Sequence, residues 1–387
     1  MKRVFYITRS DLSQAPYPEL TLPALARDGW ELVVAGPNSS KSSYRKNLPF
    51  ACQTIDLPAN GTFGAELATF RRLQQARLGK FDVIYVNCQS MSARAAIGLC
   101  GPVFGKKIVY HNPDYYSPFD HPWYYRAERH FCRNKVHLYI NNEFHRGYVT
   151  STAYRSTCPV ITCPPNLPRA WPTPRPSAEK RAYISGGNPD AFVLIVHGGF
   201  HQLRMTPQLV EALAMLPDKI RLVMTGGKRK RDEVDDLFDR LNVAHRIIRL
   251  PFMDFDELLT YTINADAGVL LYQNNDLGNF FTAPGRLTEY LLCGLPLLTS
   301  DHTGIENIML KHRAGQTASA ADPRSIAEAI RTLEAGTRAG LYAHSRMRSL
   351  FDDRFAFDHW EDRFLEHFNA MVKGTQRSKN QRPPFPW

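Results

Sequence analysis

The sequence has no apolar run approaching the roughly 20 residues that a membrane-spanning helix requires. Its first residues, MKRVFYITRSD, turn polar too soon for a secretory signal peptide. We therefore expect a cytoplasmic protein. Its 387 residues, 43% hydrophobic and 22% charged, are enough for two globular domains.

Signatures of metal sites and disulfides are also missing. The seven cysteines are scattered, odd in number and never spaced as C-x-x-C, so we expect reduced thiols rather than disulfides or a zinc site. The histidines at 121, 130, 137 and 145 lack the i, i+4 spacing of a helical metal pair. We expect no metal.

The patterns of P-loop and nucleic-acid-binding proteins are absent as well. Gly226-Gly227-Lys228 does not fit the G-x-x-x-x-G-K-[ST] spacing of a P-loop. The KRKR run at 228–231 is followed at once by acidic residues, which favours an exposed helix start. Without an RNP motif or a helix-turn-helix pattern, we expect no nucleic-acid partner.

Positive charge is concentrated in the first half of the chain. Up to residue 187 there are 24 Lys and Arg against 12 Asp and Glu, a net +12, whereas the remainder has 24 against 25. Charge of one sign on one domain indicates an anionic partner, such as lipid headgroups or a phosphorylated acceptor. Solubility alone is the alternative explanation.

Short apolar runs alternate with helical spacing through both halves, which is typical of parallel, doubly wound α/β sheets. In the first half we expect strands at 3–7, 30–35, 82–86, 107–110 and 137–141, and helices at 19–27, 67–78 and 92–100. In the second we expect strands at 192–196, 221–225, 246–250, 267–271 and 295–299, and helices at 207–216, 258–263, 305–310, 323–333, 340–350 and 357–372. Seven prolines between 159 and 176 predict an irregular, semi-rigid linker between the halves.

In a parallel sheet the ligand crevice lies at the carboxyl ends of the strands. His111 ends one strand of the first half, and Asp114, Tyr115 and Tyr116 follow it. Further along, Trp123, Tyr124 and Tyr125 add to an aromatic surface suited to a sugar or a lipid-linked acceptor. A lone histidine is more often structural, so His111 is only a candidate.

The second half repeats this arrangement. Gly198 and Gly199 follow a strand, where the backbone can approach a ligand closely, and Arg204 precedes a helix. Asp254 and Asp256 could hold a divalent metal, but capping of the following helix is the simpler role.

The segment 279–300, NFFTAPGRLTEYLLCGLPLLTS, predicts a helix capped by Thr282 and ended by Gly294, and then a buried strand. Arg286 and Glu289 are predicted to lie opposite the core-facing side. They could bind a nucleotide diphosphate and its ribose, or form an ordinary surface pair.

Five pieces in order carry a family resemblance: HGGFHQLR…LVEAL (197–213), LVMTGG (222–227), ADAGVLL (265–271), PGRLTEYLLCGLPLLTSDHTGIENIM (284–309) and AADPRSIAEAI (320–330). Together they resemble the carboxyl-terminal domain of the GT-B fold retaining glycosyltransferases of family 4. The first half is similar more loosely, through DVIYVN (82–87), KKIVYHNPD (106–114) and PPN (164–166). The last long helix, with Trp360, looks like the family's crossover toward the first domain.

The resemblance implies two Rossmann-like domains facing a central cleft. The divisions we expect are an acceptor domain at 1–165, a Pro-rich linker at 166–190, a nucleotide-sugar domain at 191–350, a crossover helix at 351–373 and a disordered tail at 374–387.

Residue by residue, the resemblance places Arg204 on the diphosphate and Glu289 on the ribose. The loop residues Thr282, Pro284, Gly285, Arg286 and Leu287, with Gly198 and Gly199, are expected to complete the nucleotide-sugar site. One position departs from the pattern, because the first Glu of the family's paired-Glu motif falls on Phe281. The usual contact to the donor sugar is therefore in doubt.

The activity implied is retaining, hexosyltransferase-type transfer from a nucleotide sugar to a glycan or lipid-linked acceptor, in polysaccharide or glycolipid assembly. Arg204, Arg286 and backbone N–H groups would stabilise the leaving diphosphate without metal or other cofactor, with His111 as a further candidate. The net charge would allow peripheral attachment at the inner face of a membrane. Two alternatives remain: a GT-B sugar-nucleotide epimerase using Asp114, and a non-catalytic nucleotide-sugar or anionic-surface binder.

Overall fold

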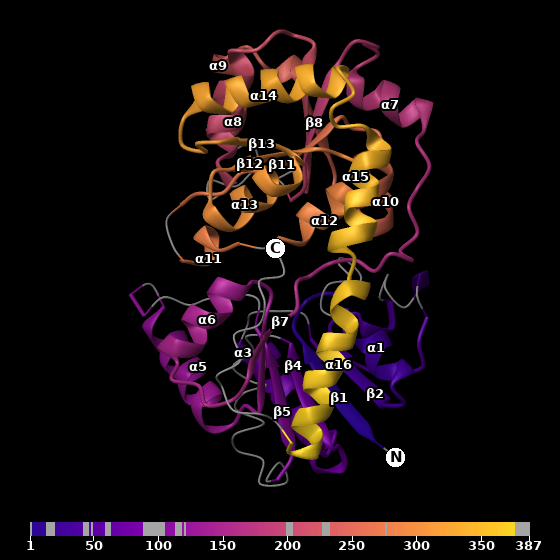
Figure 1. The fold of residues 1–387 in the computed structure, drawn as a ribbon, viewed down its shortest axis with the longest axis vertical. Helices are drawn as coiled ribbons and strands as arrows, with labels where there is room; N and C mark the ends of the chain where they lie inside the picture. The colour runs from indigo at the N-terminus through magenta and orange to yellow at the C-terminus, as the bar shows by residue number, and fades with distance from the viewer. Residues whose placement is uncertain are drawn as a thin grey trace. The chain divides into compact units, whose positions relative to one another are not determined.

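The computed structural model describes residues 2–12, 20–41, 46–47, 49–58, 63–87, 105–112, 118–119, 121–198, 204–226, 233–274, 277–282 and 284–375. They divide into two compact units (Figure 1). The first unit combines 1–171 with 357–386, and the second spans 172–356. The chain therefore passes to the second unit near Trp171 and returns to the first at Phe357.

The first unit is built on a parallel sheet of seven strands in the order β3-β2-β1-β4-β5-β6-β7. The strands are β1 Arg3–Thr8, β2 Glu31–Gly36, β3 Gln53–Asp56, β4 Val83–Asn87, β5 Lys107–His111, β6 Leu138–Asn141 and β7 Val160–Thr162. In register, Phe5 of β1 lies between Val33 of β2 and Ile84 of β4. These inner strands are almost wholly apolar because both faces of the sheet are covered.

One face of this sheet is covered by helices from the middle of the unit. They are α3 Phe63–Gln75, α5 Pro122–Asn134 and α6 Phe144–Ala153. Leu73 of α3 and Phe131 of α5 join Phe5, Ile84 and Tyr110 of the strands in one buried cluster. Burial of this surface is the main favourable term in folding the unit.

The C-terminal helix α16, Asp358–Lys373, packs in the first unit beside α1, Leu22–Arg27. Phe368 lies edge-on to Trp30 with ring centroids 5.2 Å apart, and Phe364 contacts Tyr85 at 6.5 Å. An ion pair between Arg27 and Glu361, 2.6 Å long, fixes the exposed side of this contact. The last helix of the chain therefore completes the core of the first unit.

Several sequence predictions for this part of the chain are wrong. The proline-rich segment is not irregular throughout, since strand β7 forms within it at the edge of the sheet, where a strand needs only one partner. The segment 166–190 also contains helix α7, Ala178–Ser185, capped by Ser177. Strand β3 and helices α5 and α6 were not predicted. The helix expected at 92–100 lies outside the described residues.

The second unit has a parallel sheet of six strands in the order β10-β9-β8-β11-β12-β13. The strands are β8 Phe192–Val196, β9 Ile220–Thr225, β10 Ile247–Leu250, β11 Ala267–Leu270, β12 Leu297–Ser300 and β13 Gly315–Ala318. Chain order reverses between β8 and β11, which makes the edge beyond their carboxyl ends the topological switch point. Both units are therefore doubly wound, as predicted.

Helices of the second unit connect and flank these strands. Besides α7 they are α8 Thr206–Ala214, α9 Glu233–Arg240, α10 Phe255–Thr262, α11 Leu277–Phe280, α12 Gly285–Leu292, α13 Thr303–His312, α14 Pro323–Arg338 and α15 His344–Leu350. Helix α14 contacts α8 and β13, whereas α12 contacts β11 and α15. No helix among the described residues is long and apolar enough to cross a membrane.

Two expected helices have different bounds. The N-cap of α12 is Pro284 rather than Thr282, and no side chain caps the helix, so the capping prediction is wrong. Its end is as predicted, because Gly294 turns left-handed at φ +70°. The segment 351–373 is not one helix: Phe351–Phe355 forms a π-helical turn of the second unit, and α16 begins at Asp358.

The role of α16 can be tested by removing its most buried ring. Phe368 has no exposed surface, so Phe368→Ala should lower the free energy of unfolding of the first unit by about 3–5 kcal/mol. Denaturant titration of the full chain measures this loss. Asp362→Ala, on the exposed side of the same helix, is the control and should change stability by less than about 0.5 kcal/mol. Equal effects of the two changes would contradict this packing.

Candidate functional site

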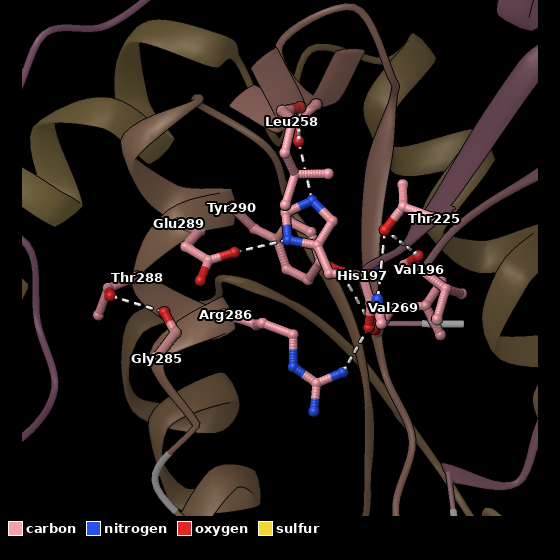
Figure 2. A network of polar contacts seen from close by, with 12 residues as sticks. Val196, His197, Thr225, Leu258, Val269, Gly285, Arg286, Thr288, Glu289 and Tyr290 are labelled. Atoms are coloured by element: carbon pink, nitrogen blue, oxygen red, sulfur yellow. Dashed lines mark hydrogen bonds and ion pairs between the residues drawn. The ribbon is translucent and has the colours of Figure 1, made fainter. Parts of the chain in front are cut away.

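Polar side chains gather at the switch point of the second sheet. His197 and Gly198 follow β8, and Tyr272 lies two residues beyond β11. Arg286, in the first turn of α12, donates to His197 O beyond β8 (Figure 2). It also donates to the Tyr272 hydroxyl beyond β11. The fold thus brings together residues up to 89 positions apart in the chain.

Two guanidinium groups converge on one backbone oxygen. Arg204 Nη1 donates to His197 O at 3.1 Å and to Gly198 O at 3.0 Å. Arg286 donates to the same His197 O at 2.7 Å and to the Tyr272 hydroxyl at 2.6 Å. Within the described ranges, neither guanidinium forms an ion pair with a carboxylate. Burial, and then the charge of Arg286, lower the pKa of Arg204, which is the expected effect of placing like charges together.

This arrangement favours an anion. Two neighbouring cations that share a neutral acceptor repel one another, and a bound phosphate group would relieve that repulsion through charge-assisted hydrogen bonds. The predicted phosphate role of Arg204 and Arg286 is therefore compatible with their positions.

Gly198 is required by the position of Arg204. Its φ is +92°, and a Cβ at this residue would lie 2.1 Å from Arg204 Nη1. The Gly198 N–H donates to Thr225 Oγ1 at 3.2 Å, at the end of β9. The turn after β8 is thus held by its neighbouring strand. Gly199, the second predicted glycine, lies outside the described residues.

Glu289 is buried, with 3% of its surface exposed. Its Oε2 lies 2.5 Å from Nδ1 of His197, and Figure 2 shows the other oxygen directed away from the ring. The interpretation of Arg286 and Glu289 as a surface pair is wrong, because Glu289 faces the strand end and Arg286 bonds elsewhere. His197 was not predicted to belong to the site, although it stands in the HGGF turn.

The hydrogen bonds of His197 define its protonation. Thr262 donates its hydroxyl hydrogen to Leu258 O at 2.8 Å, so it can only accept from His197 Nε2, also at 2.8 Å. Nδ1 and Glu289 Oε2 must then share one proton, since two bare lone pairs would repel at 2.5 Å. Burial raises the pKa of Glu289 to about 8 and lowers that of His197 well below 6.5, which favours the uncharged pair.

Tyr290 also holds His197 in place. Its hydroxyl accepts the His197 N–H at 3.0 Å, and the two ring centroids lie 4.6 Å apart. The tyrosine ring lies over Gly268 of β11, where a Cβ would come within 2.3 Å of it. A glycine in a strand therefore makes room for the ring that supports the site.

The remaining predicted loop residues have mixed positions. Leu287 is buried in the core, whereas Thr282, Pro284 and Gly285 are half-buried next to α12. Phe281, where the family pattern has Glu, contacts Phe280 with ring centroids 4.8 Å apart. An apolar pair thus occupies the position of the missing carboxylate.

Asp254 is the N-cap of α10, in the position predicted for it, but its side chain accepts no capping hydrogen bond. No group of three His, Cys, Asp or Glu side chains in the described part of the chain is arranged to hold a metal ion.

In the first unit, His111 ends β5 inside a buried hydrogen-bond chain. Its Nε2 lies 2.8 Å from Asn142 Oδ1, and its Nδ1 lies 3.1 Å from the Tyr85 hydroxyl, which accepts from Thr21. Burial lowers the pKa of His111 to about 4, so the ring is neutral at pH 7. Both nitrogens have partners within the protein, an arrangement that orders the end of the strand.

Neighbouring strands of this sheet also end in buried polar residues: Thr8, Asn87, Asn141 and Thr162. Beside them, Glu128 of α5 is fully buried and accepts from Asn112 and the hydroxyls of Tyr110 and Tyr154. The role of Glu128 was not predicted, because α5 was not expected to be a helix.

The predicted acceptor residues Asp114, Tyr115 and Tyr116 lie outside the described residues. Of the other aromatics, Trp123 is 77% exposed, whereas Tyr125 donates to Ala153 O and packs between α5 and α6. Tyr125 therefore does not join an exposed aromatic surface.

A protein-family model matches the part of the second unit that contains this site. Residues 191–335 match the model of the family described as glycosyl transferases group 1. This segment contains His197, Arg204, Arg286 and Glu289. A D-inositol 3-phosphate glycosyltransferase of Xylanimonas cellulosilytica is 29% identical over 191 residues, which cover 48% of this chain and 43% of that relative. The alignment thus spans less than half of the curated relative.

Solved structures share the fold over nearly the whole chain. Anabaena HepE in complex with UDP-glucose superposes with a TM-score of 0.73 at 16% identity, covering 96% of this chain and all of that one. WaaG, a glycosyltransferase involved in lipopolysaccharide biosynthesis, gives a TM-score of 0.68 at 15% identity, with 96% and 100% covered. The two parallel-sheet domains therefore have the GT-B fold.

The glycine turn at the site can be tested directly. Gly198→Ala forces a left-handed alanine and displaces the end of the Arg204 side chain from its bonds to His197 O and Gly198 O, so it should cost more than the ~1–2 kcal/mol of the backbone strain alone. Gly187→Ala is the matched control, because Gly187 has φ +76° but open space around its Cβ. Unfolding titrations of both variants, and of Gly198→Ala combined with Arg204→Ala, measure the difference. Equal losses for the two glycines would refute the close approach of Arg204.

Proposed function

We propose that this protein is a retaining glycosyltransferase of hexosyltransferase type that uses a nucleotide-sugar donor. The observation that carries the proposal is the pair of guanidiniums on the His197 carbonyl, with Glu289 one turn further along α12. A diphosphate between Arg204 and Arg286 would bring the nucleotide's ribose toward the free oxygen of Glu289. The fold shared with HepE, which was solved with UDP-glucose, supports this assignment.

In the proposed reaction, the acceptor hydroxyl oxygen bonds to the anomeric carbon as the bond from that carbon to the diphosphate oxygen breaks. The electron pair of the broken bond leaves with the diphosphate, which takes up the proton of the acceptor hydroxyl. Arg204 and Arg286 stabilise the charge that develops on the leaving group, so no metal or other cofactor is required. Attack from the side of the departing diphosphate retains the anomeric configuration.

For the acceptor we propose a glycan or a lipid-linked glycan, in cell-surface polysaccharide or glycolipid assembly. The net charge of +12 in the first 187 residues suits a phosphorylated or lipid-bound acceptor. The structural likeness to WaaG, described as acting in lipopolysaccharide biosynthesis, points the same way.

Nucleotide binding can be tested by thermal shift with UDP, GDP, CDP and dTDP. Loss of a charge-assisted contact should weaken the best ligand about 10- to 100-fold in Arg204→Ala and in Arg286→Ala. Arg240→Ala, an exposed arginine at the end of α9, is the control and should bind like the wild type. A wild-type protein that binds none of the four, or equal losses in all three variants, would sink the proposal.

We also propose that the protein is cytoplasmic and attaches peripherally to anionic membrane at its inner face, through α5. The exposed side of this helix carries Trp123, Arg126 and Arg133, and the Arg126 guanidinium lies 5.5 Å from the Trp123 ring centroid. Its acidic residue, Glu128, is buried. Proteins that bind peripherally to anionic membranes commonly place Trp side chains at the membrane–water interface and arginines near the lipid headgroups.

Liposome co-sedimentation tests this attachment. The wild type should bind vesicles containing anionic lipid more strongly than neutral vesicles, and Trp123→Ala with Arg126→Ala should lower the anionic partition coefficient at least about fivefold. Arg71→Ala combined with Tyr183→Ala removes the same charge and an exposed ring elsewhere and should have a smaller effect. Equal binding to both kinds of vesicle would exclude the proposal.

A further inference from the structure

His197 contacts the three side chains that the proposed function places on the diphosphate and the ribose, those of Arg204, Arg286 and Glu289. Its carbonyl oxygen accepts from Arg204 and Arg286, and its ring holds Glu289. Its own N–H and Nε2 are engaged by Tyr290 and Thr262.

The proton between His197 and Glu289 decides what the carboxyl group offers to a ligand. Oε2 is engaged with Nδ1 at 2.5 Å, and within the described ranges Oε1 has no hydrogen-bond partner. With one proton held on the Nδ1–Oε2 side, Oε1 is an oriented acceptor. Without that proton, Oε2 would face the Nδ1 lone pair, and the carboxylate would turn away from the ring.

We propose that His197 is a positioning residue for the nucleotide site, and that the single proton it shares with Glu289 orients Oε1 to accept a ribose hydroxyl of the bound nucleotide. This inference rests on the proposed donor binding. It predicts that nucleotide affinity falls when the pair loses its proton.

The surroundings of the His197–Glu289 pair set the pH at which the pair loses its proton. Burial, and then the charges of Arg286 and Arg204, lower the pKa of His197. Burial raises the pKa of Tyr290 on α12 and of Cys293 just after it, so both stay neutral when the pair titrates. Tyr272 bonds to Arg286. Burial raises the pKa of Glu289 to about 8, where the pair loses its proton.

The free protein should show this proton in its stability. Unfolded, the two groups bind one proton between pH 4.5 and 6.5 and none above 6.5, their ordinary values. Folded, the pair keeps one proton up to pH about 8. The unfolded chain then binds fewer protons between pH 6.5 and about 8, so the pair's contribution to stability falls across this window and levels off above it.

The decisive variants replace the shared proton with fixed hydrogens. Glu289→Gln donates an amide N–H to Nδ1 and keeps an oxygen in place of Oε1, and His197→Asn offers an amide donor to Oε2. The best nucleoside diphosphate from the thermal-shift panel is titrated into each full-length variant between pH 6.5 and 9. Because the same ligand is used throughout, its own ionisation cancels in the comparison with the wild type.

We expect wild-type affinity to fall about tenfold from pH 7 to 9, as one hydrogen bond is lost. Glu289→Gln should bind the nucleotide within about fivefold of wild type at pH 7, and its affinity should not fall at higher pH. The affinity of His197→Asn should likewise not fall between pH 7 and 9. Glu289→Ala should bind weakly at every pH. The control Glu328→Gln, exposed on α14, should keep the wild-type profile.

The inference is overturned if the nucleotide affinity of Glu289→Gln depends on pH as that of the wild type does. It is also overturned if Glu289→Gln keeps its fold but binds no nucleotide at pH 7. Stability of the free protein separates the two proposals. A fall in wild-type stability between pH 6.5 and 8 that Glu289→Gln removes supports the shared proton. If no nucleotide binds, the proposed function and the ribose contact both fail, while the shared proton is still supported. No such fall refutes the inference whatever the nucleotide does.

Discussion

The second unit depends on one backbone oxygen, that of His197, which accepts from two arginines at once. This contact is available because Gly198 takes a left-handed turn and leaves no Cβ in the path of Arg204. It holds two positive charges at the switch point, where a doubly wound sheet exposes a crevice. The repulsion between them is a cost that the fold sustains and that an anionic ligand would offset.

Burial changes the protonation of Glu289. An exposed glutamate would be ionised at pH 7, but Glu289 is enclosed between α12 and the end of β8 and shares a proton with His197. The enclosure depends on Tyr290, which fits over the side-chain-free Gly268 of β11. The glycine thus makes room for the tyrosine that holds His197 beside the buried Glu289.

The two units use polar residues in different ways. In the first, His111 and Glu128 are enclosed in hydrogen-bond networks that order the strand ends, so their polar atoms are satisfied internally. In the second, the polar groups at the strand ends include cations without carboxylate partners in the described ranges. Part of the basic excess of the first unit lies on exposed residues of the described ranges, such as Arg126 and Arg133 of α5.

The sequence by itself determined the alternation of apolar strands and helices, the two doubly wound sheets and the turns at Gly198 and Gly294, because period and glycine chemistry are local signals. It also singled out Arg204, Arg286 and Glu289. Only the tertiary structure decided how they are used. His197 and Glu289 are 92 residues apart in the chain, and no local pattern reports that a helix will bury one against the other. The short strand β7 and the edge strand β3 escaped prediction because tertiary pairing, rather than local propensity, stabilises them.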